Sequence, residues 1–157
     1  MSQAYGQIYV ADGSTSQVLL VATPAKMTGF ATEGPASDDL TGDLSVVPDA
    51  ANDKITVKSG GIYRVDYNIS GSMVDQHSEV EAAVRVGGVE EAGSQSKSAF
   101  SDGTETVSTN YPLTENSMSG CCIIEPTADA DVEIYLESSV HAGFVPSQAR
   151  LLVTRIG

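Results

Sequence analysis

The 157-residue sequence has no tryptophan, two cysteines, and only eight lysine and arginine residues against 21 aspartate and glutamate residues. A net charge of −13 repels polyanions, and no two basic residues are adjacent, so we expect no nucleic acid and no membrane surface as partner. No apolar run approaches the roughly 18 residues that a membrane span requires. What remains is an ordinary globular chain, whose length predicts a single domain over residues 1–157.

The N-terminal segment and the cysteines indicate where the chain folds. Residues 1–10 have neither a basic stretch nor an apolar block, so they do not resemble a signal peptide. Cys121 and Cys122 are neighbours, and a disulfide-stapled secreted domain would carry more cysteines, so we expect folding in a reducing cytoplasm. In a strand their thiols point to opposite faces. The adjacent Ile123 and Ile124 favour burial of both cysteines.

Short segments in which apolar and polar residues alternate are frequent, as expected of half-buried strands. The clearest segments are 62–70, 80–86 and 132–136. Glycine pairs at 60–61 and 87–88 predict turns next to them. Residues 72–86 also fit a helical spacing, but their β-branched residues follow the strand period. About eight to ten short strands and no convincing helix predict an all-β fold, an antiparallel sandwich or jelly roll.

Residues that could perform catalysis are few and scattered. His77 and His141 are the only histidines able to act as a base near neutral pH, and both are expected between strands. Ser94 and Lys97 match the Ser-x-x-Lys pattern of penicillin-recognising enzymes, but the two companion motifs of those enzymes are missing. We therefore predict no catalytic residue, no cofactor and no enzymatic activity.

Two groups of acidic residues are the nearest approach to a metal site. The first group, at alternate positions of a predicted strand, is Asp129, Asp131 and Glu133. The second group is Asp38, Asp39 and Asp43. Oxygen ligands suit calcium, but neither group matches the twelve-residue calcium loop with its turn glycine and closing glutamate. We interpret both groups as solvated acidic surface and assign no metal ligand, while calcium binding by the acidic loops stays an open alternative.

Residues 53–157 resemble the globular heads of the tumour necrosis factor and complement superfamily. The segment Ile-Thr-Val-Lys-Ser-Gly-Gly-Ile-Tyr-Arg-Val-Asp-Tyr at 55–67 is similar to the strand–turn–strand core of those heads. Later segments resemble the family's hairpin and its last three strands, in the same order, at 84–89, 117–124, 129–135 and 149–157. Glycine replaces the hairpin asparagine, and Ala128-Asp129 replaces Gly-Asp. The resemblance implies a ten-strand jelly roll, a homotrimer and no catalytic residue.

Within that superfamily, Gly-Gln-Ile-Tyr-Val at 6–10 and Arg-Ile-Gly at 155–157 resemble tailed-phage virion proteins. This likeness implies a capsid decoration protein on the virion surface, with the major capsid protein lattice as its partner. The alternatives are the receptor- or glycan-binding head of a phage fibre or bacterial surface trimer, and an enzyme on the same scaffold. We expect the first strand near residue 5, without a preceding stalk, which favours decoration.

The closing segment 150–156 is apolar on both faces, so we expect it at the centre of a sheet or at an interface. Leu151 and Val153 should face one way, and Leu152 and Ile156 the other. One face should pack inside the domain, and part of the other at a three-fold axis, as the resemblance implies. These four residues are therefore the candidates for the trimer interface.

Overall fold

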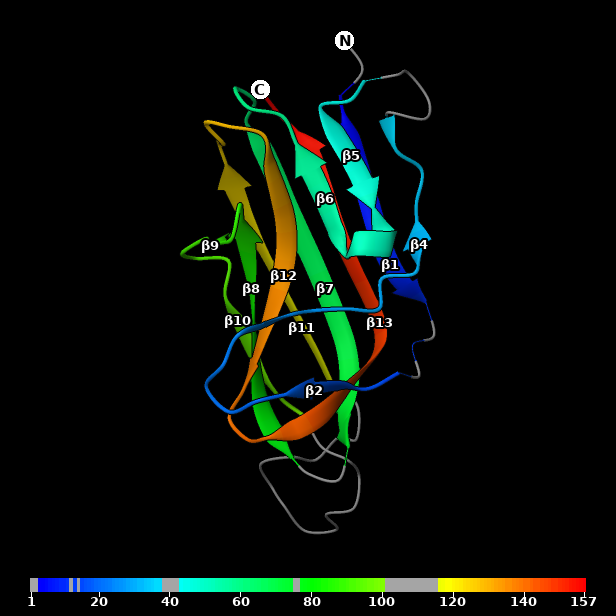
Figure 1. The fold of residues 1–157 in the computed structure, drawn as a ribbon, viewed down its shortest axis with the longest axis vertical. Coiled ribbons are helices and arrows are strands. Elements are labelled where there is room, and N and C mark those ends of the chain that lie inside the picture. The colour runs from blue at the N-terminus through cyan, green and yellow to red at the C-terminus, as the bar shows by residue number, and fades with distance from the viewer. Residues whose placement is uncertain (1–2, 12, 14, 38–42, 75–76, 101–115) are drawn as a thin grey trace.

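The computed structural model describes residues 3–11, 13, 15–37, 43–74, 77–100 and 116–157, which form a two-layered β-sandwich (Figure 1). The strands are β1 (Tyr5–Ala11), β2 (Gln17–Leu19), β3 (Ala25–Lys26), β4 (Thr32–Glu33), β5 (Val46–Asp49), β6 (Lys54–Val57), β7 (Tyr63–Val74), β8 (Ser78–Val86), β9 (Val89–Glu90), β10 (Ser96–Phe100), β11 (Asn116–Ile124), β12 (Ala130–Ser138) and β13 (Ala142–Arg155). A single turn of 3-10 helix, Ala50–Asn52, precedes β6. No helix in the described part of the chain is long and apolar enough to cross a membrane. The all-β prediction is confirmed.

The strands form two antiparallel sheets. In the β7–β13 sheet the order is β11-β7-β13-β1-β4, and β2 pairs with the far end of β13. In the β8–β12 sheet the order is β10-β8-β12-β6-β5, with β3 on β12 and β9 on β8. The chain passes from one sheet to the other between β6 and β7, at the predicted Gly60-Gly61 turn, where Gly60 has a φ of 74°. This arrangement is a jelly roll.

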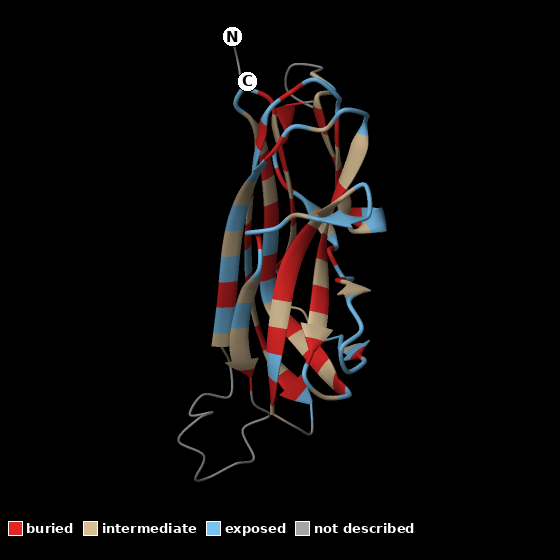
Figure 2. Ribbon diagram, turned by 90° about the vertical axis from the view of Figure 1, so that its left-hand side faces the viewer, coloured by how far each residue is buried: buried red, intermediate tan, exposed pale blue. Residues whose placement is uncertain are grey.

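Period-two alternation places the core between the sheets, as Figure 2 shows by the repeated change of colour along single strands. In β7 the buried side chains Tyr63, Val65, Tyr67 and Ile69 alternate with single polar residues. Phe100 and Phe144 meet edge to face across the sheets, with ring centroids 5.1 Å apart. The core is therefore complete within one chain, and residues on the outer faces are not needed to close it.

Several local predictions are confirmed and one alternative is wrong. The glycine pair at 87–88 has φ values of 57° and 84°, which suits the two-residue β8–β9 hairpin that the sequence predicts. The helical alternative for 72–86 is wrong, because β7 extends to Val74 and β8 begins at Ser78. The closing strand is central, between β7 and β1, but it starts at Ala142, eight residues before the predicted segment.

One segment crosses the end of the sandwich. β2 pairs with β13 in one sheet, the next residues turn at the Leu20–Thr23 bridge, and β3 then pairs with β12 in the other sheet. Within this crossing segment, residues 17–26, Val21 lies beside Ser138 at the end of β12. Figure 1 shows β2 spanning the lower end of the molecule. The crossing exposes apolar side chains next to the end of the β8–β12 sheet.

Candidate functional site

The structure does not bring the predicted catalytic candidates together. His77 lies just before β8, and His141 lies in the turn between β12 and β13. Ser94 is fully buried, where its hydroxyl donates to the Glu91 carbonyl (2.7 Å) and accepts from a backbone N–H (2.9 Å), while Lys97 lies at the surface. Among the residues that the structure describes, no three histidine, cysteine, aspartate or glutamate side chains are grouped to hold a metal ion.

The acidic residues at the start of β12 share one face, as predicted, but they are ion-paired. The pairs are Lys58–Asp129 at 2.7 Å, Lys54–Asp131 at 2.9 Å and Lys26–Glu133 at 2.8 Å. The hydrogen bond from Lys58 lowers the pKa of Asp129. At Asp131 burial acts to raise the pKa, but hydrogen bonds from Lys54 and Thr56 outweigh it, so the pKa of Asp131 is also lowered. Lysines thus occupy the positions at which a bound cation would compensate these carboxylates.

The second acidic group lies mostly outside the described residues, which exclude Asp38 and Asp39. The Asp43 carboxylate accepts a hydrogen bond from the backbone N–H of Ser45 at 2.9 Å, and contacts with Ser45 lower the pKa of Asp43. This carboxylate therefore caps a local turn.

The two cysteines point to opposite faces of β11, but the expectation that both are buried is wrong. Cys121 is exposed, and so is Ile123, with 65% of its surface accessible. The reason is that β11 is the edge strand of its sheet, and its alternate side chains point away from the other sheet. Cys122 packs against the core, and this burial raises the pKa of its thiol to about 11.

We expect the two cysteine-to-serine variants to differ in stability. Cys122→Ser should lower the free energy of unfolding by about 1–3 kcal/mol, because a half-buried hydroxyl replaces an apolar thiol. Cys121→Ser should leave it within about 0.5 kcal/mol of the parent value, because that side chain is exposed. Urea denaturation of both variants at one protein concentration measures the difference. Equal losses would contradict the burial assignment.

The outer face of the β7–β13 sheet, which points away from the second sheet, carries several apolar residues. Strand register places Leu152 in one row across the sheet, beside Gln7, Asp66 and Cys121. The exposed fractions at the end of this sheet are 38% for Ile62, 65% for Ile123 and 47% for Ile156. We call these three isoleucines together with Leu152 the outer apolar face.

The closing strand shows the predicted alternation. Leu151 and Val153 have no accessible surface and belong to the core of their own chain. Leu152 is partly exposed and Ile156 is exposed, both on the outer apolar face. Of the four residues expected at a trimer interface, only Leu152 and Ile156 are therefore accessible to another subunit.

No protein-family model and no curated protein match the sequence. Solved structures with a similar fold include Eiger, a tumour necrosis factor of S. frugiperda (TM-score 0.63, 10% identity, 100% of this chain and 94% of that one). They also include the globular domain of zebrafish complement 1qA (TM-score 0.56, 9% identity, 99% and 97% covered) and murine APRIL (TM-score 0.56, 8% identity, 99% and 100% covered). At these identities the likeness shows the fold, a jelly roll of the tumour necrosis factor and complement type.

Proposed function

We propose that the chain is a non-enzymatic, homotrimeric head that serves as a capsid decoration protein on the virion surface of a tailed phage. The observation that carries the proposal is the outer apolar face, which lies on a sandwich whose core is already complete. Large apolar side chains that stay exposed on an outer face, although the core is complete without them, favour a surface that a partner covers. In a closed trimer, each subunit contributes the same face around a three-fold axis.

The fold supports this assembly. The match covers 94% and 97% of two solved chains of the tumour necrosis factor and complement type, and the resemblance of residues 53–157 to that superfamily implies a homotrimer. The central position of β13 places Leu152 in the middle of the outer face rather than at its rim. Three copies can therefore bury this face without displacing a core residue.

The charge of the chain supports a position on the outside of a DNA-filled shell. A subunit of charge −13 is repelled by a packaged polyanion, so its stable position is the outer surface. Trimeric symmetry suits three-fold or quasi-three-fold positions of the major capsid protein lattice. Three weak contacts that form together give much tighter attachment than one. Such a protein clamps neighbouring capsomers and stabilises the shell without any chemistry.

Two measurements test this function. Light scattering should give a mass three times that of the 16.3 kDa subunit, and a mass of one subunit would overturn the trimer. Particles stripped of the protein should then lose heat resistance and regain it when the protein is added back. If stripped particles stay equally robust but no longer adsorb to cells, the receptor-binding head replaces the decoration protein.

A further inference from the structure

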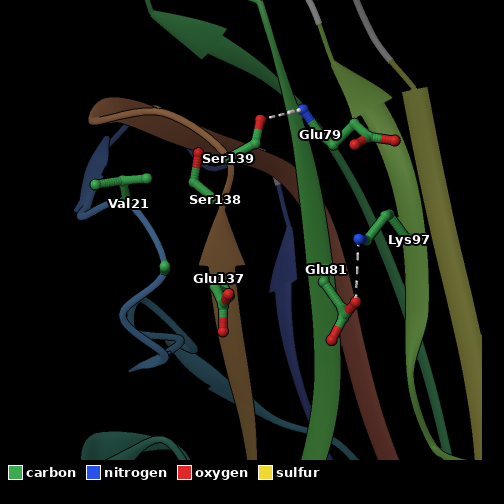
Figure 3. Close-up of a pocket in the computed structure, with 8 residues that line it drawn as sticks. Val21, Glu79, Glu81, Lys97, Glu137, Ser138 and Ser139 are labelled. Carbon is green, nitrogen blue, oxygen red and sulfur yellow. Dashed lines mark hydrogen bonds and ion pairs between the residues drawn. The ribbon is translucent and has the colours of Figure 1, made fainter.

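A hollow of about 120 Å³ lies where β8 begins and β12 ends (Figure 3). We call it the acidic hollow, and its lining is Val21, Ala22, Glu79, Glu81, Lys97, Glu137, Ser138 and Ser139. β8, β10 and β12 supply the charged side chains, and the crossing segment 17–26 supplies the apolar ones. The hollow therefore lies between two surfaces of different chemistry.

The carboxylates of this hollow outnumber its cations: Glu79, Glu81 and Glu137 line it together with Lys97. Glu81 and Glu137 are directly opposite each other on neighbouring antiparallel strands, a position in which like charges destabilise a sheet. Lys97, the only basic residue among the described residues of the lining, contacts Glu81 at 3.4 Å. Each acidic residue at the start of β12 has a lysine partner, but Glu137 forms no ion pair with any described residue. The carboxylates at the start of β12 are thus each paired with a lysine, whereas the hollow at its end has more carboxylates than lysines.

The opposite wall of the hollow is apolar and exposed. Val21 lines it with 55% of its surface accessible, and Leu20 and Val18, which precede Val21 on the crossing segment outside the lining, are 45% and 62% accessible. We call these three residues the apolar ledge. A lysine or arginine side chain has an aliphatic stem and a cationic head, so its two parts match the ledge and the carboxylates. Figure 3 shows Val21 on one side of the hollow and Glu81 on the other.

We propose that the acidic hollow and the apolar ledge form a docking site for a basic segment of another protein. A lysine or arginine of that segment would place its head between Glu81 and Glu137, with an apolar neighbour on Val18 and Leu20. The charge complementarity is specific to this end of the sheet, because the other acidic positions of β12 already have lysines. The site would take such a segment whichever assembly carries the head.

A second copy of this chain does not have the chemistry of the partner. Seven of the eight basic side chains already contact a carboxylate, an aromatic ring or a carbonyl of their own chain: Lys26, Lys54, Lys58, Arg64, Arg85, Lys97 and Arg155. The basic segment must therefore come from a different protein.

The test uses a short fluorescent peptide that alternates lysine and valine, and a control peptide with glutamine in place of lysine. Fluorescence anisotropy at low ionic strength should show binding of the lysine peptide only. The double variant Glu81→Gln/Glu137→Gln should lower its affinity at least about fivefold, since both carboxylates of the hollow are lost. Val21→Ser should lower it about threefold through the loss of apolar contact.

A matched control separates the hollow from the overall charge of the protein. Glu90→Gln/Glu125→Gln also removes two carboxylates, both of them exposed and outside the lining of the hollow, and should change affinity less than about twofold. Equal losses in the two double variants would overturn the proposal in favour of general attraction. Equal binding of the glutamine peptide would leave only an apolar contact and would also overturn it.

Two further outcomes would assign the hollow to another occupant. Full displacement of the peptide by calcium chloride, at an ionic strength matched with sodium chloride, would make it a cation site. A change in the light-scattering mass of Glu81→Gln/Glu137→Gln would make it a contact between copies of the chain. Either result would overturn the docking site for a basic segment. Neither depends on whether the outer apolar face forms the trimer.

Discussion

Leu152→Asp is expected to convert the proposed trimer into single subunits that remain folded. Leu152 points away from the core at the centre of the β7–β13 sheet, so the change leaves the interior of the domain intact. In the trimer, three carboxylates would lose their hydration near the three-fold axis without a counter-charge, a cost of several kcal/mol per buried ion. The light-scattering mass should therefore fall from three times to one times the 16.3 kDa subunit mass.

Two companion variants identify the cause of that change. The introduced aspartate also faces Asp66 within its own subunit, so Leu152→Asn tests whether polarity alone weakens the contact without this like-charge pair. Val89→Asp introduces the same charge at a residue of the other sheet that is 68% exposed, and it should leave the trimer intact. If Val89→Asp dissociates the protein as well, or if Leu152→Asp stays trimeric, the contact does not involve the outer apolar face.

The parts of the fold that could be predicted from sequence are those that local alternation determines. β7 and β12 each have one core face and one outer face, so their apolar residues recur at every second position. The β8–β9 hairpin has two adjacent glycines that adopt positive φ values with little strain, which makes its turn recognisable. In each case residues within about ten positions of one another specify the element.

Elements that depend on distant partners could not be predicted. The first half of β13 contains Pro146 and a register shift at 146–148, so its strand period is interrupted, although β7 and β2 both pair with it. β3 has only two residues and forms because β12 is available to pair with it. The exposure of Cys121 follows from the position of β11 at the edge of its sheet, which alternation along β11 does not reveal.

The same limit applies to the candidate surfaces. Sequence alternation correctly placed Asp129, Asp131 and Glu133 on one face, but it could not supply their partners. Lys26 and Glu133 are 107 positions apart and meet only because β3 pairs with β12. The opposition of Glu81 and Glu137 likewise depends on the register of β8 against β12. To predict which charges on a sheet are paired, one therefore needs the order and register of the strands as well as their positions in the sequence.

Leu151→Ala is expected to lower the free energy of unfolding by about 2–5 kcal/mol, in contrast to changes at its neighbour Leu152. Leu151 has no accessible surface and belongs to the core cluster, so the truncation removes buried methyl groups and leaves a cavity between the sheets. Leu151→Met, which nearly conserves volume, should cost less than about 1.5 kcal/mol. Urea denaturation followed by circular dichroism measures all three proteins.

The stability loss of Leu151→Ala should be measured in a protein that does not associate, because association adds to the apparent free energy of unfolding. Bound subunits stabilise the folded state by mass action, so a trimer-weakening change would also lower the unfolding midpoint. In the Leu152→Asp background, where we expect single subunits, this contribution is removed and the loss caused by Leu151→Ala should persist in full. Leu152→Ala should instead lower the midpoint only at protein concentrations at which the parent is associated, and its effect should vanish on dilution to single subunits. If the two alanine variants behave alike, the assignment of adjacent residues on β13 to opposite faces, one in the core and one at the subunit contact, is wrong.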